Sequence, residues 1–308
     1  MANYLIRRLI TSFFVLIGVS VLVFSIIHLV PGDAVTAILG SQKVNASTVA
    51  QLREQLGLND PIPLQYWRYL SHALQGDLGN SIRNSVPVAR AIREQIPSTL
   101  ALAFSALLLA LVIGFGLGLA AALHHGSWLD TLAMGVSVSG LSIPTFWLGL
   151  LLILLFSVSL GWLPSISTGS SLRALVLPAL TLGLPEAAVV ARMVRASMLD
   201  VLGKEYIMAA RAKGLPRTSV IMKHALRNAL IPVVTFIGLQ MAYLLGGSTI
   251  VETMFARQGI GRLAVTAISN RDYPVVQGVV LVTAVVYVLI NTLTDIGYTL
   301  LNPKIRLK

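Results

Sequence analysis

The chain alternates between long apolar stretches and shorter polar segments rich in glycine, proline and charged residues. Six of the apolar stretches run for about 20 residues, the length of helix that crosses the hydrocarbon core of a bilayer. The pattern therefore predicts an all-α integral membrane protein with six transmembrane helices. The spans are expected at Leu9–Val30, Thr99–Leu123, Thr131–Ser157, Leu175–Val194, Ala229–Ile250 and Val275–Leu301.

The first apolar run follows Arg7 and Arg8, an arrangement that a secretory signal peptide also shows. The run is longer than the roughly 7–15 apolar residues of a typical signal core, and no clean A-x-A cleavage site follows it. We therefore interpret it as a retained membrane helix rather than as a signal peptide.

Basic residues near the ends of the spans predict the orientation, because cytoplasmic loops of membrane proteins are rich in lysine and arginine. Arg7 and Arg8 place the N-terminus in the cytoplasm, and six crossings return the basic C-terminal segment 304–308 to the same side. The densest basic segment, residues 192–227, then lies in the cytoplasm as well. Both termini are therefore expected to be cytoplasmic.

We expect three regions along the chain. Residues 1–30 form the cytoplasmic N-terminus and the first transmembrane helix, and residues 31–98 form an extracytoplasmic element. Residues 99–308 form the transmembrane core, which includes a cytoplasmic coupling loop at 195–228. Long loops of this kind are often functional, so the outer element is either a docking surface or a packed cap over the helices.

Composition excludes several classes of protein. The 308 residues are 56% hydrophobic and 11% charged, with a mean hydropathy of +0.81, so one soluble core cannot hide the apolar surface. The net charge of +11 is explained by the basic inner loops, and we expect no nucleic acid partner. The chain has no cysteine, and its five histidines form no ligand-spaced pair on a helix, so no metal site is expected.

The predicted inner loop contains a short helix, which ends where Gly214 supplies a stop and Pro216 prevents continuation. A flat face of small side chains with a basic rim allows a partner to approach closely. Such a helix either docks a partner or lies passively at the surface, and we favour docking. The residues that share this face, at i, i+3, i+4 and i+7, are Tyr206, Ala209, Ala210 and Lys213.

This segment resembles the EAA loop of ABC importer permeases, whose short helix couples to the ATPase subunit. Met208-Ala209-Ala210 stands where the general pattern has Glu-Ala-Ala, so the glutamate is absent. The strings ARAKGL at 210–215 and HALRNAL at 224–230 are similar to the version in the peptide/nickel/opine branch. Further strings resemble the B-type permease of that branch: Arg7-Arg8-Leu9, Pro31-Gly32-Asp33, Gly76-Asp77-Leu78-Gly79, Leu160–Pro164, Leu177–Leu180 and Leu301-Asn302-Pro303.

The resemblance implies the type I ABC importer permease fold and a multi-pass protein of the bacterial cytoplasmic (inner) membrane. It implies import of di- or oligopeptides delivered by an extracytoplasmic substrate-binding protein, with nickel, opine, glutathione or haem as alternative substrates. The implied partners are a homologous C-type permease chain and two ATP-binding subunits, which hold ATP and Mg. The residues that it assigns to coupling are Lys204, Glu205, Tyr206, Met208, Ala209, Ala210, Arg211, Lys213 and Gly214.

The chain carries no Walker A motif for binding ATP. Its single Gly-Lys pair, Gly203-Lys204, is followed by Glu205 instead of serine or threonine. We therefore expect a permease subunit that is not itself an enzyme and binds no cofactor of its own.

Polar residues inside the predicted spans are candidates for the translocation pathway, because such groups are costly in a membrane. Glu186 either meets the amino group of a peptide or pairs with a neighbouring helix or Arg192, and we favour the structural pairing. Asp295 is expected to pair with Arg192 or Arg195. The candidate pathway residues are Ser142, Glu186, Gln240 and Asn291.

Two other classes of membrane protein compete with this interpretation. An ion-coupled secondary transporter needs coupling acids at broken helices, and Glu186 alone is thin support. A membrane enzyme needs a clustered nucleophile, base or metal site, and the sequence shows none. We therefore favour the importer subunit.

Overall fold

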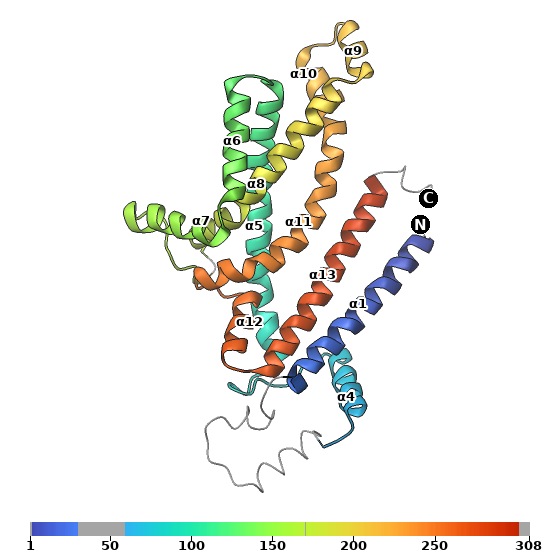
Figure 1. Ribbon diagram of the computed structural model, residues 1–308, viewed down its shortest axis with the longest axis vertical. Helices are drawn as coiled ribbons and strands as arrows, with labels where there is room; N and C mark the ends of the chain where they lie inside the picture. Colours follow the sequence, from blue (N-terminus) through green and yellow to red (C-terminus); the bar gives the residue numbers. More distant parts are fainter. Residues whose placement is uncertain (1, 30–58, 170, 302–308) are drawn as a thin grey trace. The chain divides into compact units, whose positions relative to one another are not determined.

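The structure, a computed structural model, describes residues 2–29, 59–169 and 171–301, and the regular elements within these ranges are helices (Figure 1). Two of them, η1 and η2, are π-helical. The elements are α1 (Ala2–Leu29), α4 (Ile62–Leu74), α5 (Val88–Leu123), α6 (Trp128–Ser142), α7 (Thr145–Leu152), η1 (Ile153–Ser159), α8 (Leu172–Leu202), α9 (Glu205–Ala212), α10 (Arg217–Ser219), η2 (Val220–Ala225), α11 (Leu226–Met254), α12 (Ile260–Ser269) and α13 (Tyr273–Leu301).

The chain divides into two compact units, and each is described by itself. The first consists of residues 1–97 and 262–289, and the second consists of residues 98–261 and 290–308. The boundaries fall within α5, α12 and α13. Residues 31–58 of the expected extracytoplasmic element lie outside the described residues.

In the first unit, α4 packs against the second half of α1 through aromatic side chains. Tyr66 Oη lies 2.7 Å from Ser20 Oγ, and the Tyr66 and Phe24 rings meet edge to face with centroids 5.4 Å apart. The Tyr69 ring lies 5.9 Å from Phe24, and its buried hydroxyl has no hydrogen-bond partner among the described residues. Burial, and to a smaller extent Tyr66, raise the pKa of Tyr69 to about 12.

Buried Asp272 joins the start of α13 to the segment that precedes α5. Its carboxylate accepts hydrogen bonds from Ser81 Oγ at 2.5 Å and from the Ile82 amide at 3.2 Å. One turn further along α13, Gln277 Nε2 donates to the Val23 carbonyl of α1 at 3.1 Å. These bonds satisfy polar groups that would otherwise be costly to bury.

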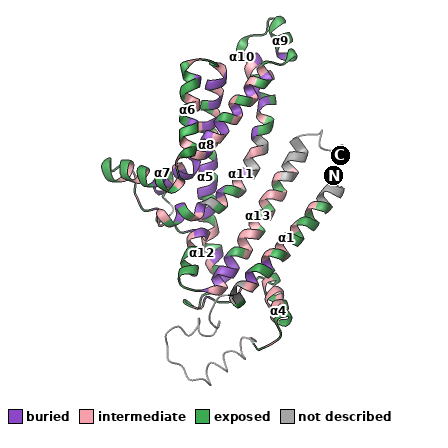
Figure 2. Ribbon diagram, viewed as in Figure 1, coloured by how far each residue is buried: buried purple, intermediate pink, exposed green. Residues whose placement is uncertain are grey.

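In the second unit, α8 is the central helix. It packs against α6, α7 and α11, and 67% of its most apolar stretch is buried. Figure 2 shows the buried residues of this helix in purple. Glycines let α5 approach α8 closely. A Cβ atom on Gly118 would lie 2.4 Å from the Ala191 carbonyl oxygen, and one on Gly114 would lie 2.5 Å from the Ala187 carbonyl oxygen. Larger residues at either glycine would therefore push the two helices apart.

Each predicted span falls on helical structure, but one of them is broken. α1, α5, α8 and α13 are each long and apolar enough to cross a membrane, and α11 covers the predicted span Ala229–Ile250. The predicted span Thr131–Ser157 consists instead of α6 followed by α7 and η1, which meet at a 106° bend. Ile143 is extended at the bend, and Pro144 has no amide hydrogen to continue the helix.

Two helices differ from the sequence prediction. α5 begins at Val88 rather than at Thr99 and continues through Pro97, so the last part of the expected outer element is already helical. α12 was not expected, because its apolar run is too short to count as a span.

Candidate coupling surface

The short cytoplasmic helix predicted from the sequence is present as α9. Only Gly203 and Lys204 separate it from α8, and extended Lys204 begins it. Gly214 has a φ of +74°, and the Leu215 amide reaches back to the last turn of α9 at 3.4 Å. The left-handed glycine ends the helix where the sequence predicted a stop.

One face of α9 is built into the core of the second unit. Ile207 is 0% exposed and Ala210 is 8% exposed. Both belong to one apolar cluster with Met198 and Val201 of α8 and with Ala229 of α11. Such interiors are close-packed and transmit strain, so a force on α9 acts on η2, against which α9 packs, and through the shared cluster on α8 and α11.

A hydrogen bond also fastens the first turn of α9 to α11. Tyr206 Oη accepts from Asn228 Nδ2 at 2.9 Å, and the same amide group donates to the His224 carbonyl at 3.1 Å. Asn228 and His224 both belong to the HALRNAL string. In this structure the HALRNAL segment therefore holds α9 in place through the hydrogen bond from Asn228 to Tyr206.

The predicted docking face is divided by the packing. Ala210 is buried, whereas Tyr206, Ala209 and Lys213 remain exposed. Helical spacing places all four on one face, but alanine suits either side of a helix, and Ala210 joins Ile207 on the buried side. The open surface of the α9 region consists of Lys204, Glu205, Tyr206, Met208, Ala209, Arg211, Ala212, Lys213 and Gly214.

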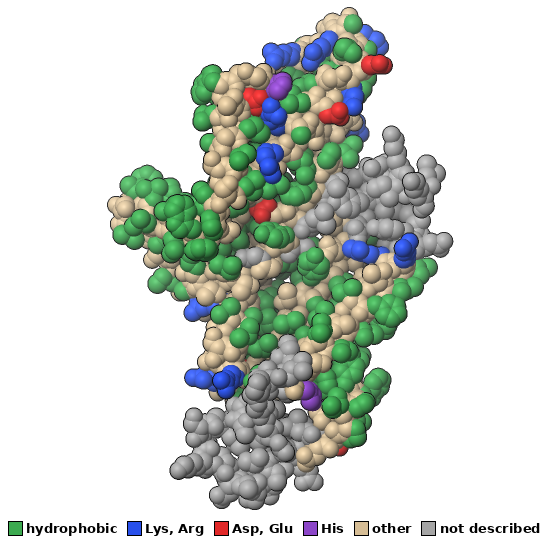
Figure 3. All heavy atoms as spheres, in the orientation of Figure 1, with side chains coloured by type: hydrophobic (Ala, Val, Ile, Leu, Met, Phe, Trp, Pro, Cys, Tyr) green, Lys and Arg blue, Asp and Glu red, His purple; other side chains and the backbone are tan. Residues whose placement is uncertain are grey.

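Basic side chains gather around this open surface at the α9 end of the molecule (Figure 3). Arg211, Lys213 and Arg217 are exposed there. Lys204 forms an ion pair with Asp200 at 2.9 Å, on the last turn of α8. A small-residue surface with a basic rim is complementary to a groove with acidic edges.

Of the four candidate pathway residues, two lie next to each other in the structure. Glu186 of α8 and Gln240 of α11 are both 8% exposed, and their side chains lie next to each other. Ser142 is exposed and donates to the Val138 carbonyl within its own helix at 3.1 Å. Asn291 is half-buried, and the described contacts do not join it to the other three.

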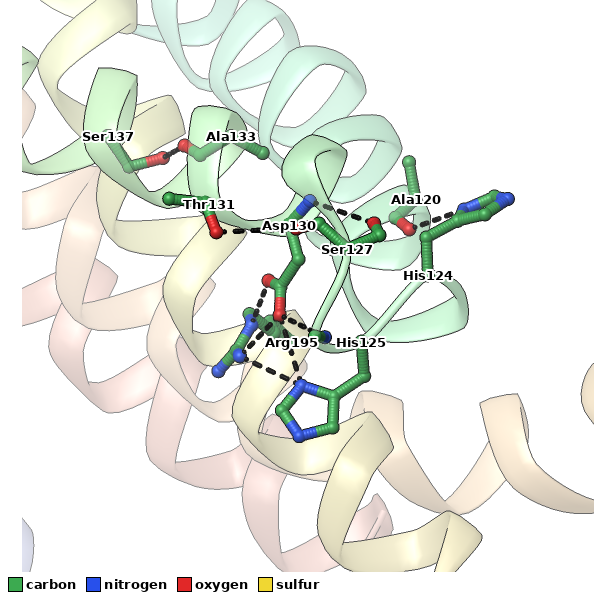
Figure 4. Close-up of polar contacts among 10 residues, drawn as sticks. Ala120, His124, His125, Ser127, Asp130, Thr131, Ala133, Ser137 and Arg195 are labelled. Carbon is green, nitrogen blue, oxygen red and sulfur yellow. Dashed lines mark hydrogen bonds and ion pairs between the residues drawn. The ribbon is translucent and has the colours of Figure 1, made fainter.

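Arg195 pairs with Asp130 of α6, a partner that was not predicted from the sequence (Figure 4). Arg195 Nε lies 2.6 Å from Asp130 Oδ1, and Nη2 lies 2.8 Å from Oδ2. Arg192 is exposed, and no described contact joins it to Glu186. The Asp295 side chain lies outside the described residues. Asp130 immediately precedes the predicted span Thr131–Ser157, where a charge is not costly, so its position in the sequence does not indicate a buried pair.

A buried polar cluster at the other end of α11 was also missed. Glu252 is 0% exposed, and its carboxylate accepts a hydrogen bond from Thr99 Oγ1 at 2.6 Å. Thr99 Oγ1 in turn accepts a hydrogen bond from the Ile260 amide at 2.9 Å. A Cβ on Gly259 would lie 2.2 Å from the Glu252 carboxyl carbon, so a larger residue there would have to displace the Glu252 carboxylate. Burial lowers the pKa of Arg257, and the Glu252 charge opposes this effect. The described residues contain no group of three or more His, Asp or Glu able to hold a metal, so the cluster is a polar network.

Comparison with known proteins identifies the family. Residues 114–307 match the model of the binding-protein-dependent transport system inner membrane component, and residues 1–103 match the model of its N-terminal region. The chain belongs to this family. It is 45% identical to the glutathione transport system permease protein GsiC of Salmonella paratyphi A (strain ATCC 9150 / SARB42) over 308 residues, 100% of each chain. The GsiC protein of Escherichia coli (strain K12) is 46% identical over the same length and coverage.

Solved structures of ABC importers show the same fold. The MetNI methionine ABC transporter, in inward-facing conformations, matches with a TM-score of 0.57 and 25% identity over 68% of this chain and 96% of that chain. An amino acid ABC transporter crystallised with histidines matches with a TM-score of 0.55 and 16% identity over 68% and 94%. The second likeness concerns the fold alone.

These findings confirm the predicted class. The chain is a permease subunit of an ABC importer and a multi-pass protein of the inner membrane. Its relatives are membrane components of transport systems, without an ATPase domain of their own. The alternatives of a secondary transporter and of a membrane enzyme are therefore overturned.

Proposed function

We propose that this permease is the B-type subunit of an importer for short peptides, and that glutathione is among its substrates. The support is the full-length similarity to proteins named as glutathione transport permeases. Glutathione is itself a tripeptide, so this proposal stays within the peptide class that the sequence predicted. Nickel, opine and haem are the competing substrates.

The proposed topology has six spans with both termini in the cytoplasm. α1, α5, α8, α11 and α13 supply five of them, and the broken pair of α6 with α7 and η1 supplies the sixth. The basic surface around α9 then faces the cytoplasm, in agreement with the excess of lysine and arginine on that side of membrane proteins. The element at 31–98 is proposed to meet the substrate-binding protein on the opposite side.

Transport is driven, in this proposal, through the open surface of α9. That surface docks into one of two ATP-binding subunits, which hold ATP and Mg, while a related C-type chain completes the pathway. The buried anchor formed by Ile207 and Ala210 passes movement of the ATPase to α8 and α11. ATP can shift the permease between states only through contacts that differ between them, and α9 supplies those contacts.

The buried pair of Glu186 and Gln240 is the proposed polar feature beside the pathway. Pro185 precedes Glu186 and removes one hydrogen bond from α8, which leaves a carbonyl group free in the membrane. Ser142 at the α6 bend and Asn291 on α13 are proposed to line the route as the helices rearrange. Capture by a separate binding protein requires only weak selectivity from these residues.

The exposed surface of α9 with its basic rim, above the buried anchor of Ile207 and Ala210, is the observation that carries the proposal. Copurification of the tagged chain in mild detergent, followed by mass spectrometry, tests it. Recovery of a related permease and of ATP-binding subunits is the expected result. A chain recovered without any ATP-binding subunit, under conditions that retain the second permease, would contradict it.

A further inference from the structure

The ion pair between Asp130 and Arg195 is more strongly built than an ordinary surface pair. Arg195 grips the carboxylate with two nitrogens at 2.6 and 2.8 Å, and the Gly126 amide donates to Oδ2 at 3.1 Å (Figure 4). The Asp130 side chain is 6% exposed and the Arg195 side chain is 24% exposed. Two-pronged pairs of this kind fix geometry as well as charge.

His125 completes the cluster from the loop between α5 and α6. Its Nδ1 lies 3.0 Å from Asp130 Oδ2 and 3.1 Å from Arg195 Nη2. The ring nitrogen accepts from Arg195 in one tautomer and donates to Asp130 in the other. Either arrangement holds the loop against the ion pair.

The pair joins α6 to α8, the helix that leads into α9. Asp130 lies in the first turn of α6, and Arg195 lies on α8 one turn before Met198, which packs in the same cluster as Ile207 of α9. Only two residues separate the end of α8 from α9. α6 packs along α8 and leads to the bend at residues 142–144.

We propose that Asp130 and Arg195 are a positioning pair, which makes α6 follow α8 when the ATPase moves α9. This role rests on the proposed function, because it presupposes docking of an ATPase at α9. Without the pair, α9 and α8 still respond to ATP, but α6 and the bend beyond it no longer move with them. The consequence is ATP hydrolysis that is no longer converted fully into transport.

The test uses the complete importer in proteoliposomes and measures glutathione uptake together with ATP hydrolysis. In the double variant Asp130→Asn/Arg195→Met no unpaired charge is left buried, so the protein is expected to reach the membrane in normal amount. Uptake per ATP hydrolysed is expected to fall about fivefold, the factor that corresponds to losing about 1 kcal/mol of coupling between α6 and α8. Arg195→Lys keeps the positive charge but cannot make both hydrogen bonds to Asp130, so a partial fall in uptake per ATP is expected.

Asp200→Asn is the matched control, since Asp200 lies on the same helix as Arg195 and its ion pair with Lys204 is exposed. It is expected to keep uptake per ATP within about twofold of the original, because exposed pairs contribute little. An unchanged ratio in the double variant, or an equal fall in Asp200→Asn, overturns the positioning role. If the double variant does not reach the membrane, an unchanged ratio in Arg195→Lys overturns it instead. An original complex without ATP-dependent uptake would refute the proposed function first, and the positioning role with it.

Discussion

The glycines on either side of α9, Gly203 and Gly214, have different backbone conformations. Gly214 lies in the left-handed region, where an L side chain is strained, whereas Gly203 at the end of α8 has a right-handed φ of −85°. A Cβ on Gly203 would meet its nearest neighbours at 3.7 Å, an ordinary contact. The α9 helix therefore depends on glycine at one end only.

Replacing Gly214 with alanine is expected to cost about 1–2 kcal/mol locally, because the left-handed conformation is strained for any residue with a Cβ. The end of α9 should fray, and ATP-dependent uptake should fall severalfold, as measured in proteoliposomes. Gly203→Ala is the control and should leave uptake nearly unchanged. Equal losses in both variants would show that the conformation of Gly214 is not the reason for the glycine.

The hydroxyl groups of two tyrosines in α4 are expected to contribute differently to stability. Tyr66 is hydrogen-bonded to Ser20, whereas the buried Tyr69 hydroxyl has no described partner. Tyr69→Phe should therefore keep or raise the thermal stability in detergent, and Tyr66→Phe should lower the free energy of unfolding by about 0.5–1.5 kcal/mol. A larger loss from Tyr69→Phe than from Tyr66→Phe would contradict the described contacts.

At the scale of elements, α9 is a helix with one face in the core and one face open. Ile207 and Ala210 form its anchor, and Ala209 lies next to Ala210 but is exposed. Adjacent alanines therefore serve different purposes. One packs against the membrane helices, and the other is available to a partner.

Introducing glutamate at these adjacent positions should distinguish an effect on ATPase docking from an effect on the folding of α9. Ala209→Glu places a charge on the open face and should change stability by no more than about 0.5 kcal/mol, while it abolishes retention of the ATPase in a copurification. Ala210→Glu buries a charge without a partner and should destabilise α9 itself, which limited proteolysis would detect. Retention of the ATPase by Ala209→Glu at the original level would argue against docking at this face.

The sequence predicted the elements better than their contacts. Apolar runs long enough to span a bilayer located the helices, and Gly214 with Pro216 located the end of α9. Helical periodicity could not tell that Ala210 faces the core, because alanine carries too little hydrophobic signal. It also could not pair Asp130 with Arg195 or Glu252 with Thr99, since those partners lie far apart along the chain and meet only through packing.

At the scale of the whole molecule, the proposed topology puts the basic surface around α9 on the cytoplasmic side of the membrane. The chain contains no cysteine, so a single introduced cysteine reports its own side of the membrane without any background labelling. Ala212 and Arg90 are both exposed and are expected on opposite sides. These positions make the topology directly measurable.

In intact cells a membrane-impermeant maleimide should label Arg90→Cys but not Ala212→Cys, whereas in inverted vesicles it should label Ala212→Cys. This result follows from six crossings with cytoplasmic termini, because one position precedes the second span and the other follows the fourth. Permeabilised cells, in which both positions should react, provide the control. Labelling of Ala212→Cys in intact cells would refute the proposed orientation.

ATP-driven uptake by the reconstituted complex tests the central claim most directly. The permease, its copurifying partners and a substrate-binding protein would be placed in proteoliposomes, and labelled glutathione would be followed with and without ATP inside. The account predicts accumulation that requires ATP and that is lost in Ala209→Glu. Accumulation that proceeds without ATP, or that survives this substitution, would contradict coupling through α9.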